Sequence, residues 1–298
     1  MQLIIQHLNK TYSNGVQALK DVNLTIYQGM FGLLGPNGAG KSTLMRTLAT
    51  LQEADSGSVM LDDLDVLNQK DEVRKILGYL PQEFGVYPKI EAELLLNHLA
   101  VLKGVANRNE RKELVHALLN RTNLWSVRNR KLGSFSGGMK QRFGIAQALL
   151  ANPKLIIVDE PTAGLDPAER NRFLNLLSEI GENTIVILST HIVDDVKELC
   201  RHMAIINGGE MLYHGRTSEA LTKLEGKIWK KRVSKSELAV YKENLTVVSE
   251  RLLEGMPEIR VLSETNPDDS FEKIPVGLED VYFTTISEHS LNLTIIKK

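Results

Sequence analysis

The chain has 298 residues, 42% of them hydrophobic, and its 36 lysines and arginines nearly balance its 37 aspartates and glutamates. This balance argues against a strongly electrostatic nucleic-acid-binding protein, so no nucleic-acid partner is expected. The single cysteine, Cys200, excludes an internal disulfide and fits a reducing compartment.

The amino-terminal stretch MQLIIQHLNKTY lacks the basic start and the long apolar core of a secretory signal. The longest apolar runs along the chain fall far below the roughly 20 residues that span a bilayer. We therefore expect that, if the protein serves a membrane, it does so from the cytoplasmic side.

The glycine-rich loop GPNGAGKST at residues 35–43 follows an apolar run typical of a buried strand and precedes a stretch with helical spacing. It meets the pattern G-x-x-x-x-G-K-[ST]. Glycines let successive backbone N–H groups point at phosphate oxygens, and the helix start adds partial positive charge. Lys41 would reach the β- and γ-phosphates, and the Ser42 hydroxyl would bind Mg²⁺. The loop predicts a nucleoside-triphosphate site formed by Gly35, Pro36, Asn37, Gly38, Ala39, Gly40, Lys41, Ser42 and Thr43.

Residues 132–153, LGSFSGGMKQRFGIAQALLANP, predict an amphipathic helix that Ser136 caps and that stops before Pro153. The SGG at its start, a hydroxyl followed by two unencumbered N–H groups, also has the character of a second phosphate clamp. A single chain needs only one such phosphate-binding turn for one triphosphate. The second turn is therefore expected to bind the triphosphate of another chain, in a pair of chains that face each other head to tail.

The run KLIIVDE at residues 154–160 predicts a strand that is covered on both faces and ends in two carboxylates, where ligand sites of α/β sheets lie. Asp159 would hold Mg²⁺ directly or through water, and Glu160 would activate or position an attacking water. A second buried strand, NTIVILST, ends next to His191. From the residues alone, His191 is as readily a structural hydrogen-bonding group as a catalytic one.

Together these stretches resemble the ATP-binding subunit of an ABC transporter over about residues 1–215. GPNGAGKST resembles its Walker A element, LIIVDE its Walker B element, FSGGM its signature, AGLDP its D-loop and His191 its switch histidine. Gln82 resembles the glutamine that links Mg²⁺ and the attacking water to the helical subdomain, and Tyr12 the aromatic residue that stacks on adenine. The signature departs from its commonest form at Met139, where glutamine is usual. The departure puts little in doubt, because the phosphate contacts come from Ser136 and the backbone after it.

The resemblance implies an α/β fold, a P-loop NTPase cassette with a RecA-like core, an antiparallel β subdomain and a helical subdomain at about residues 84–150. A small α+β accessory domain would follow at residues 216–298. Two chains would sandwich two ATP molecules, with the Walker elements of one chain facing Ser136, Gly137 and Gly138 of the other, and Asp166 would couple the two sites. The implied catalytic residues are Glu160, His191, Lys41 and Gln82, and the implied Mg²⁺ ligands are Ser42, Gln82 and Asp159.

The partners implied by the resemblance are membrane permease subunits and a second ATP-binding subunit, identical or homologous. Phe84, Val86 and Tyr87 are a candidate groove for a permease's coupling helix, although the same residues would also suit the subdomain's own core. We expect the protein in the cytoplasm, bound peripherally to the inner face of the cell membrane.

Beyond a hairpin turning at Gly208-Gly209, the pattern changes. GKIWKKRV alternates like an edge strand, SKSELAVYKEN has helical composition, residues 245–264 predict two strands, and GLEDVYFTTIS predicts a short helix. The basic run KIWKKR suits a solvated strand face better than an anionic-lipid contact. LEDVYF at 278–283 resembles the closing helix of type 2 ABC exporters and favours export over import.

Two other classes of function compete with an exporter ATPase. A soluble ABC ATPase acting on ribosomes or DNA would carry a second cassette, a long coiled coil or a zinc hook, and this sequence shows none of these. A regulatory module that binds but barely hydrolyses ATP is disfavoured by Glu160 and His191. The transported substrate, the permease, the choice between homodimer and heterodimer and the role of the C-terminal segment stay open.

Overall fold

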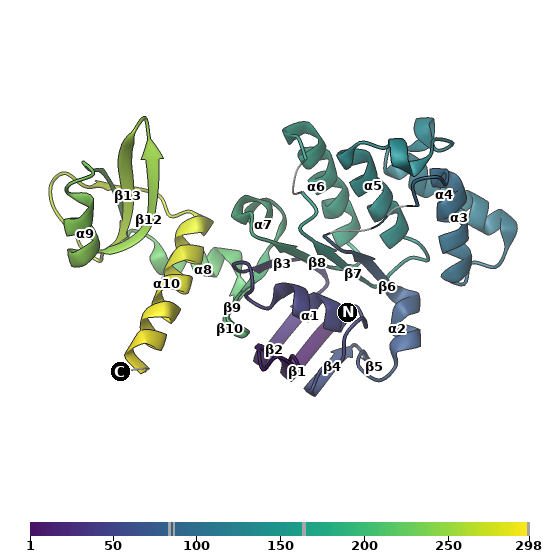
Figure 1. The fold of residues 1–298 in the computed structure, drawn as a ribbon, viewed down its shortest axis with the longest axis horizontal. Coiled ribbons are helices and arrows are strands. Elements are labelled where there is room, and N and C mark those ends of the chain that lie inside the picture. The colour runs from purple at the N-terminus through teal and green to yellow at the C-terminus, as the bar shows by residue number, and fades with distance from the viewer. Residues whose placement is uncertain (83–84, 86, 163–164, 297–298) are drawn as a thin grey trace.

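The computed structural model describes the backbone of residues 1–82, 85, 87–162 and 165–296, with side chains up to residue 289 (Figure 1). Among these residues the strands form three sheets. The largest is a six-stranded sheet in the order β10–β9–β3–β8–β7–β6, parallel throughout except for the β9–β10 hairpin. Its strands are β3 (Gly29–Leu34), β6 (Leu77–Leu80), β7 (Leu155–Asp159), β8 (Ile185–Thr190), β9 (His202–Asn207) and β10 (Glu210–Arg216).

The apolar runs of β7 and β8 reflect burial on both faces of this sheet. Ile156 and Val158 enter one hydrophobic core, whereas their neighbours Leu155 and Ile157 enter another. A strand covered on both sides requires apolar residues at every position rather than at every second one. The continuous runs in the sequence are therefore explained by the layers above and below the sheet.

One face of the central sheet is covered by a second, antiparallel sheet in the order β2–β1–β4–β5 and by two short helices (Figure 1). The helix α1 begins at Lys41, so the last three residues of the glycine-rich segment 35–43 form its first turn. The elements of this layer are β1 (Gln2–Thr11), β2 (Gln17–Tyr27), β4 (Ser56–Leu61), β5 (Leu64–Asp65), α1 (Lys41–Leu48) and α2 (Lys70–Ile76).

The opposite face is covered by helices, and the helical part of the chain lies beyond them at one end of the molecule (Figure 1). The predicted helix after Ser136 is α5, and Ser136 Oγ accepts the backbone N–H of Met139 at 3.3 Å, as an N-cap does. The helices are α3 (Ala92–Leu102), α4 (Arg108–Arg121), α5 (Gly137–Ala148), α6 (Pro167–Gly181) and α7 (Val193–Leu199), with short 3₁₀ turns at Trp125–Val127 and Leu132–Ser134. The predicted α/β architecture, with an antiparallel sheet and a helical part, is confirmed.

The C-terminal residues form a separate antiparallel sheet in the order β12–β13–β11–β14, with helices around it (Figure 1). The two strands predicted at residues 245–264, the helix in SKSELAVYKEN and the hairpin at Gly208-Gly209 are all present. The elements are α8 (Thr217–Leu224), β11 (Ile228–Arg232), α9 (Leu238–Asn244), β12 (Thr246–Leu253), β13 (Met256–Leu262), β14 (Glu272–Lys273) and α10 (Leu278–Ile296).

Two predictions for this region were wrong. The strand β11 is not at an edge, because it pairs with β13 on one side and with the two-residue β14 on the other. Its lysines tolerate this position because carboxylates pair with them, Lys230 with Glu272 at 3.1 Å and Lys231 with Asp268 at 3.3 Å. The closing helix is not short either, since α10 spans 19 residues.

Candidate nucleotide-binding site

The loop between β3 and α1 is shaped by glycines at its two ends. A β-carbon on Gly35 would lie 2.4 Å from the carbonyl oxygen of Ile206, so the strand β9 leaves no room for a side chain there. Gly40 has a φ of 109°, and a β-carbon on it would lie 2.5 Å from the carbonyl oxygen of Ala18. The loop therefore packs tightly against β9 and β2 and ends at the start of α1, where backbone N–H groups can bind an anion.

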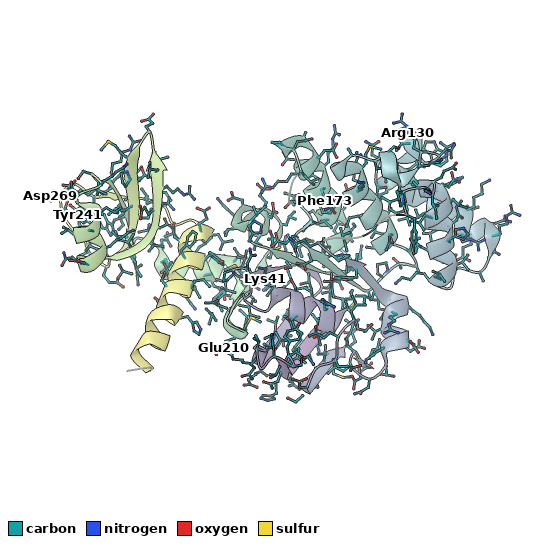
Figure 2. All side chains as sticks on the ribbon, in the orientation of Figure 1. Lys41, Arg130, Phe173, Glu210, Tyr241 and Asp269 are labelled. Atoms are coloured by element: carbon teal, nitrogen blue, oxygen red, sulfur yellow. The ribbon has the colours of Figure 1, made fainter. Side chains whose placement is uncertain are left out.

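A cavity of about 440 Å³ opens over this loop. Figure 2 places Lys41 near the middle of the molecule, where α1 begins below the central sheet. The cavity brings together residues from the start of the chain, the loop and the carboxyl ends of β7 and β8. Its lining is Tyr12, Val16, Gln17, Ala18, Pro36, Asn37, Gly38, Ala39, Gly40, Lys41, Ser42, Thr43, Gln82, Asp159, Glu160, His191, Gly208 and Gly209.

Lys41 is almost completely buried, and its ammonium group is held by the loop itself. Nζ donates to the carbonyl oxygens of Gly35 at 2.6 Å and of Pro36 at 3.2 Å. Burial lowers the pKa of Lys41, and the nearby carboxylates of Glu160 and Asp159 oppose that effect. The cavity thus contains one positive charge beside two acidic side chains.

Asp159 and Glu160 end β7, and both are buried, at 5% and 6% exposure. Ser42 Oγ donates to Asp159 Oδ2 at 3.4 Å, which joins the start of α1 to the end of β7. Glu160 turns away from the strand direction with a φ of 50°, while its N–H donates to the carbonyl of Ser189 at 2.8 Å. This kink lets two consecutive carboxylates face one cavity.

His191, which follows β8, lies next to Glu160, with Nδ1 2.7 Å from Glu160 Oε2. Its side chain is 58% exposed, so it forms the solvent side of the cavity. Tyr12 also lines the cavity. Its hydroxyl donates to Gln52 Oε1 at 2.9 Å and lies 3.1 Å from Thr43 Oγ1.

Five of the predicted binding residues do not line this cavity, and one of them is Gly35 at the start of the glycine-rich loop, whose carbonyl oxygen accepts from Lys41 Nζ. The other four lie on other elements. Ser136, Gly137 and Gly138 begin α5, and Asp166 caps α6 by accepting the N–H of Glu169 at 2.9 Å. Of these residues, Ser136, Gly137 and Asp166 are exposed and Gly138 is partly so. Phe84, Val86 and the first two residues of AGLDP lie outside the described residues.

Sequence reasoning missed five residues of the lining. Gly208 and Gly209 were predicted only as a hairpin turn, yet this turn touches the glycine-rich loop, because Gly209 N–H donates to the Ala39 carbonyl at 2.9 Å. Gln17 and Ala18 reach the cavity with Val16 from the start of β2. The consecutive glycines at 208–209 were the signal that could have indicated a close backbone approach.

The parallel sheet, the glycine-rich loop before a helix and the paired carboxylates at the neighbouring strand end define a P-loop nucleoside triphosphatase. The family model for ABC transporters matches residues 19–163. The ABC transporter ATP-binding protein NatA of Bacillus subtilis is 38% identical over 67% of this chain and 82% of its own length. The chain belongs to the ATP-binding subunits of ABC transporters, and it is an ATPase whose hydrolysis is coupled to transport.

Two further comparisons extend this picture. The probable multidrug ABC transporter ATP-binding protein YbhF of Escherichia coli is 35% identical over 85% of this chain, which spans about half of that relative, 48% of its length. The dimeric, post-hydrolysis structure of the ATP-binding cassette MJ0796, bound to ADP and phosphate, aligns with a TM-score of 0.66 at 28% identity, over 72% of this chain and 98% of that one. Within the described residues, no helix is both long enough and apolar enough to cross a membrane.

Proposed function

We propose that this chain is the ATPase subunit of an ABC exporter, in which two ATP-binding subunits close around two ATP molecules and drive a separate membrane permease. The observation that carries the proposal is the cavity that joins the glycine-rich loop, both carboxylates of β7 and His191. Residues 1–215 would form the ATP-binding cassette, with its helical subdomain at about 84–150, and residues 216–298 an accessory unit.

Mg²⁺ fits the donor set in this cavity. The Ser42 hydroxyl and the Asp159 carboxylate converge, and oxygen atoms are the ligands that Mg²⁺ prefers. The described residues contain no cluster of three or more His, Cys, Asp or Glu side chains suited to a metal, which agrees with an ion that takes its other ligands from phosphates and water. Ser42, Asp159 and Gln82 would hold the ion, which offsets negative charge on the transferred phosphoryl group when bound.

The remaining residues act directly on ATP and water. Lys41 would bind the β- and γ-phosphates, Tyr12 would stack on the base, and the loop residues 35–43 would donate N–H groups. Glu160 would accept a proton from the attacking water or orient it, and His191 would hold the γ-phosphate beside it.

Four of the predicted residues outside the cavity would be parts of a second site, which serves a partner subunit. Ser136, Gly137, Gly138 and Asp166 would bind or couple the ATP of a partner subunit, which explains why their exposed N–H groups and carboxylate do not face this chain's own loop. The MJ0796 cassette is itself dimeric. Binding would close the dimer, and hydrolysis would remove the γ-phosphate bridge and open it.

Export is the direction that YbhF and the C-terminal unit favour. YbhF is named as a probable multidrug transporter subunit, and its match extends beyond the first 215 residues of this chain. The helix that contains LEDVYF, α10, is present. A permease would dock near Gln82 and Tyr87, and the side chain of Tyr87 is exposed. This docking would hold the subunit at the inner face of the membrane.

A pull-down of the tagged Glu160→Gln variant from detergent-solubilised native membranes, with and without ATP, tests this proposal. We expect a polytopic membrane protein in stoichiometric amount, and its identity would indicate the transported substrate. Capture of ribosomal or DNA-bound proteins from the soluble fraction alone would overturn the transporter role proposed for this chain.

A further inference from the structure

Tyr12 lies on the loop that joins β1 to β2, and hydrogen bonds within the loop fix its backbone. Its N–H donates to the Val16 carbonyl at 2.9 Å, and its carbonyl accepts the Gly15 N–H at 2.9 Å. The residue is 38% exposed. A partly exposed side chain on a loop can occupy several rotamers, and ordering it when a ligand binds weakens the affinity. A contact that holds the ring in advance would therefore strengthen binding at the cavity.

The segment that follows α1 makes such contacts with the end of β1 and with Tyr12. Asp55 Oδ2 accepts the Thr11 N–H at 2.6 Å, and Gln52 Oε1 accepts the Tyr12 hydroxyl at 2.9 Å. Asp55 N–H also donates to the Asn9 carbonyl at 2.9 Å. The backbone beside Tyr12 and the tip of its ring are thus both held by one short segment. Gln52 is not among the described residues that line the cavity, so it would act on a nucleotide through Tyr12.

Two hydroxyl protons determine which partner can hold Tyr12 when phosphates are bound. The Tyr12 hydroxyl also lies 3.1 Å from Thr43 Oγ1, on the glycine-rich segment. A phenol has one proton, so while Tyr12 donates to Gln52 it accepts from Thr43. Phosphate oxygens are strong acceptors and would compete for the Thr43 proton. The Gln52 carbonyl needs no proton of its own and remains available to Tyr12.

The Gln52 amide is paired at its oxygen end. Within the described residues, its nitrogen, Nε2, is buried and has no hydrogen-bond partner. An unpaired buried donor opposes folding, and such a group requires an explanation other than stability. A side chain that is held for its carbonyl oxygen, although its nitrogen stays unpaired, agrees with a role in positioning Tyr12.

We propose that Gln52 is a positioning residue that holds the Tyr12 hydroxyl, so that the ring is fixed as a base-binding surface before a nucleotide enters. The proposal rests on the ATP site proposed above, in which Tyr12 stacks on the base. Gln52 contributes to affinity for the base and not for the phosphates, because its contact with the cavity is the tyrosine ring.

A double-mutant cycle in ATP affinity tests whether Gln52 acts through the Tyr12 hydroxyl. Gln52→Leu removes the acceptor and keeps a side chain of similar size, and Tyr12→Phe removes the donor and keeps the ring. We expect each change to raise the Kd of the full chain for Mg-ATP about threefold, the size expected when one side chain must be ordered on binding. The double variant should bind no more weakly than either single variant, because both changes remove the same hydrogen bond. Titration calorimetry measures these affinities, and effects that multiply in the double variant would overturn the proposal.

Inorganic tripolyphosphate, which has no base, provides a second readout. Its affinity in the presence of Mg²⁺ should be the same for Gln52→Leu and for the unmodified protein. A change that disturbed Thr43 and the glycine-rich loop would instead weaken tripolyphosphate and ATP alike. Equal weakening of the two ligands would therefore overturn the role of Gln52 as a residue that acts through the ring.

Glu53→Gln is the matched control, because Glu53 is the next residue in the chain and its side chain is 74% exposed. We expect this variant to bind Mg-ATP as the unmodified protein does. A Kd raised as much by Glu53→Gln as by Gln52→Leu would mean that any change in this segment disturbs the site, and the specific role of Gln52 would be excluded. An unmodified protein that does not bind Mg-ATP would overturn the ATP site proposed for this cavity, and the role of Gln52 with it.

Discussion

Glu160 combines a strained backbone with a buried charge. A φ of 50° costs a residue with a β-carbon about 1–2 kcal/mol, and the side chain lies beside a second carboxylate at 6% exposure. Such strain persists only where the surrounding structure imposes it, as the hydrogen bond from Glu160 N–H to Ser189 does here. Strain and burial of this kind cost stability, which agrees with the role in activating water proposed for Glu160.

We therefore expect Glu160→Gln to lower the steady-state ATPase rate by about 10²-fold or more, because a general base typically supplies 10²–10⁴-fold. ATP affinity should change little, since the amide keeps the shape of the side chain. Phosphate release and equilibrium ATP binding measure the two effects. Glu179→Gln, an exposed carboxylate on α6, is the control. Turnover preserved in Glu160→Gln would exclude the proposed role.

Lys41 provides a pH-dependent test of the same cavity. Because burial lowers its pKa below the ordinary 10.5, the unfolded chain binds this proton more strongly than the folded protein does. Between the lowered pKa and 10.5 the unfolded state holds more protons, so the contribution of Lys41 to stability rises with pH through that window. Below the window both states are protonated and the contribution stays constant.

Urea unfolding of nucleotide-free protein at several pH values, beside the variant Lys41→Met, isolates this contribution. We expect the stability of the unmodified protein relative to Lys41→Met to increase as the pH rises toward 10.5. If the difference in unfolding free energy between the unmodified protein and Lys41→Met stayed constant or decreased as the pH rose, Lys41 would not be desolvated in the folded protein.

At the scale of elements, the sequence predicted the helices and strands that have a strong local pattern, such as a continuous apolar run or a capping residue. The buried strands before the loop, before Asp159 and before His191 were predicted from apolar runs, and Ser136 from its capping position. The position of β11 was mispredicted, because alternating lysines look solvated until the carboxylates that pair with them are known. Those carboxylates, Glu272 and Asp268, come about 40 residues after the lysines in the sequence. Local sequence patterns cannot predict a pairing over that separation.

The attachment of α10 to the C-terminal sheet depends on a buried ion pair. Asp280, 1% exposed, accepts two hydrogen bonds from Arg260 NH1 at 2.7 and 2.9 Å and a third from Gly277 N–H at 2.8 Å. Removing one partner of such a pair costs about 3–5 kcal/mol, because the other charge stays buried alone. The neighbouring Glu279 pairs with Arg251 at the surface instead.

We expect Arg260→Ala to lower the free energy of unfolding by about 3 kcal/mol, because it leaves the buried Asp280 without its charged partner, and to raise hydrogen exchange first in α10. Glu279→Gln, which removes an exposed pair one residue away, should cost less than about 1 kcal/mol. Denaturant titration and exchange mass spectrometry measure both. Similar effects of the two changes would mean that burial does not decide the strength of these pairs.

At the scale of the molecule, the candidate site was predicted better than the network behind it. Lys41, Asp159 and Glu160 could be predicted because each follows a strong local pattern, whereas the role of His191 came only from the family resemblance, since a single histidine after a strand has no distinctive pattern. The contacts that join Thr162 and Arg170 to Asp195 could not be predicted, because a buried aspartate on a short helix has no pattern of its own in the sequence. Its partners are defined only when α6 and α7 pack side by side.

The helix α10 connects the C-terminal unit to the cassette core. Its first turns place Leu278, Val281 and Tyr282 in the same hydrophobic core as Val196 of α7 and Met203 of β9. The same helix is tied to the C-terminal sheet by Asp280. Because one helix is shared by the cassette core and the C-terminal sheet, the stabilities of the two parts are linked.

We therefore expect the intact protein to unfold in one calorimetric transition, and Leu278→Ala to separate the C-terminal sheet as an earlier one. Leu278 is 2% exposed, and a buried Leu→Ala change costs about 2–5 kcal/mol, all of it at the contact that couples the two parts. The control is Glu288→Ala on the exposed side of the same helix, which should keep a single transition. Differential scanning calorimetry distinguishes the cases, since two resolved transitions make the van't Hoff enthalpy smaller than the calorimetric one. Two transitions already present in the unmodified protein would mean that α10 does not couple them, and the accessory unit would then melt independently of the ATPase.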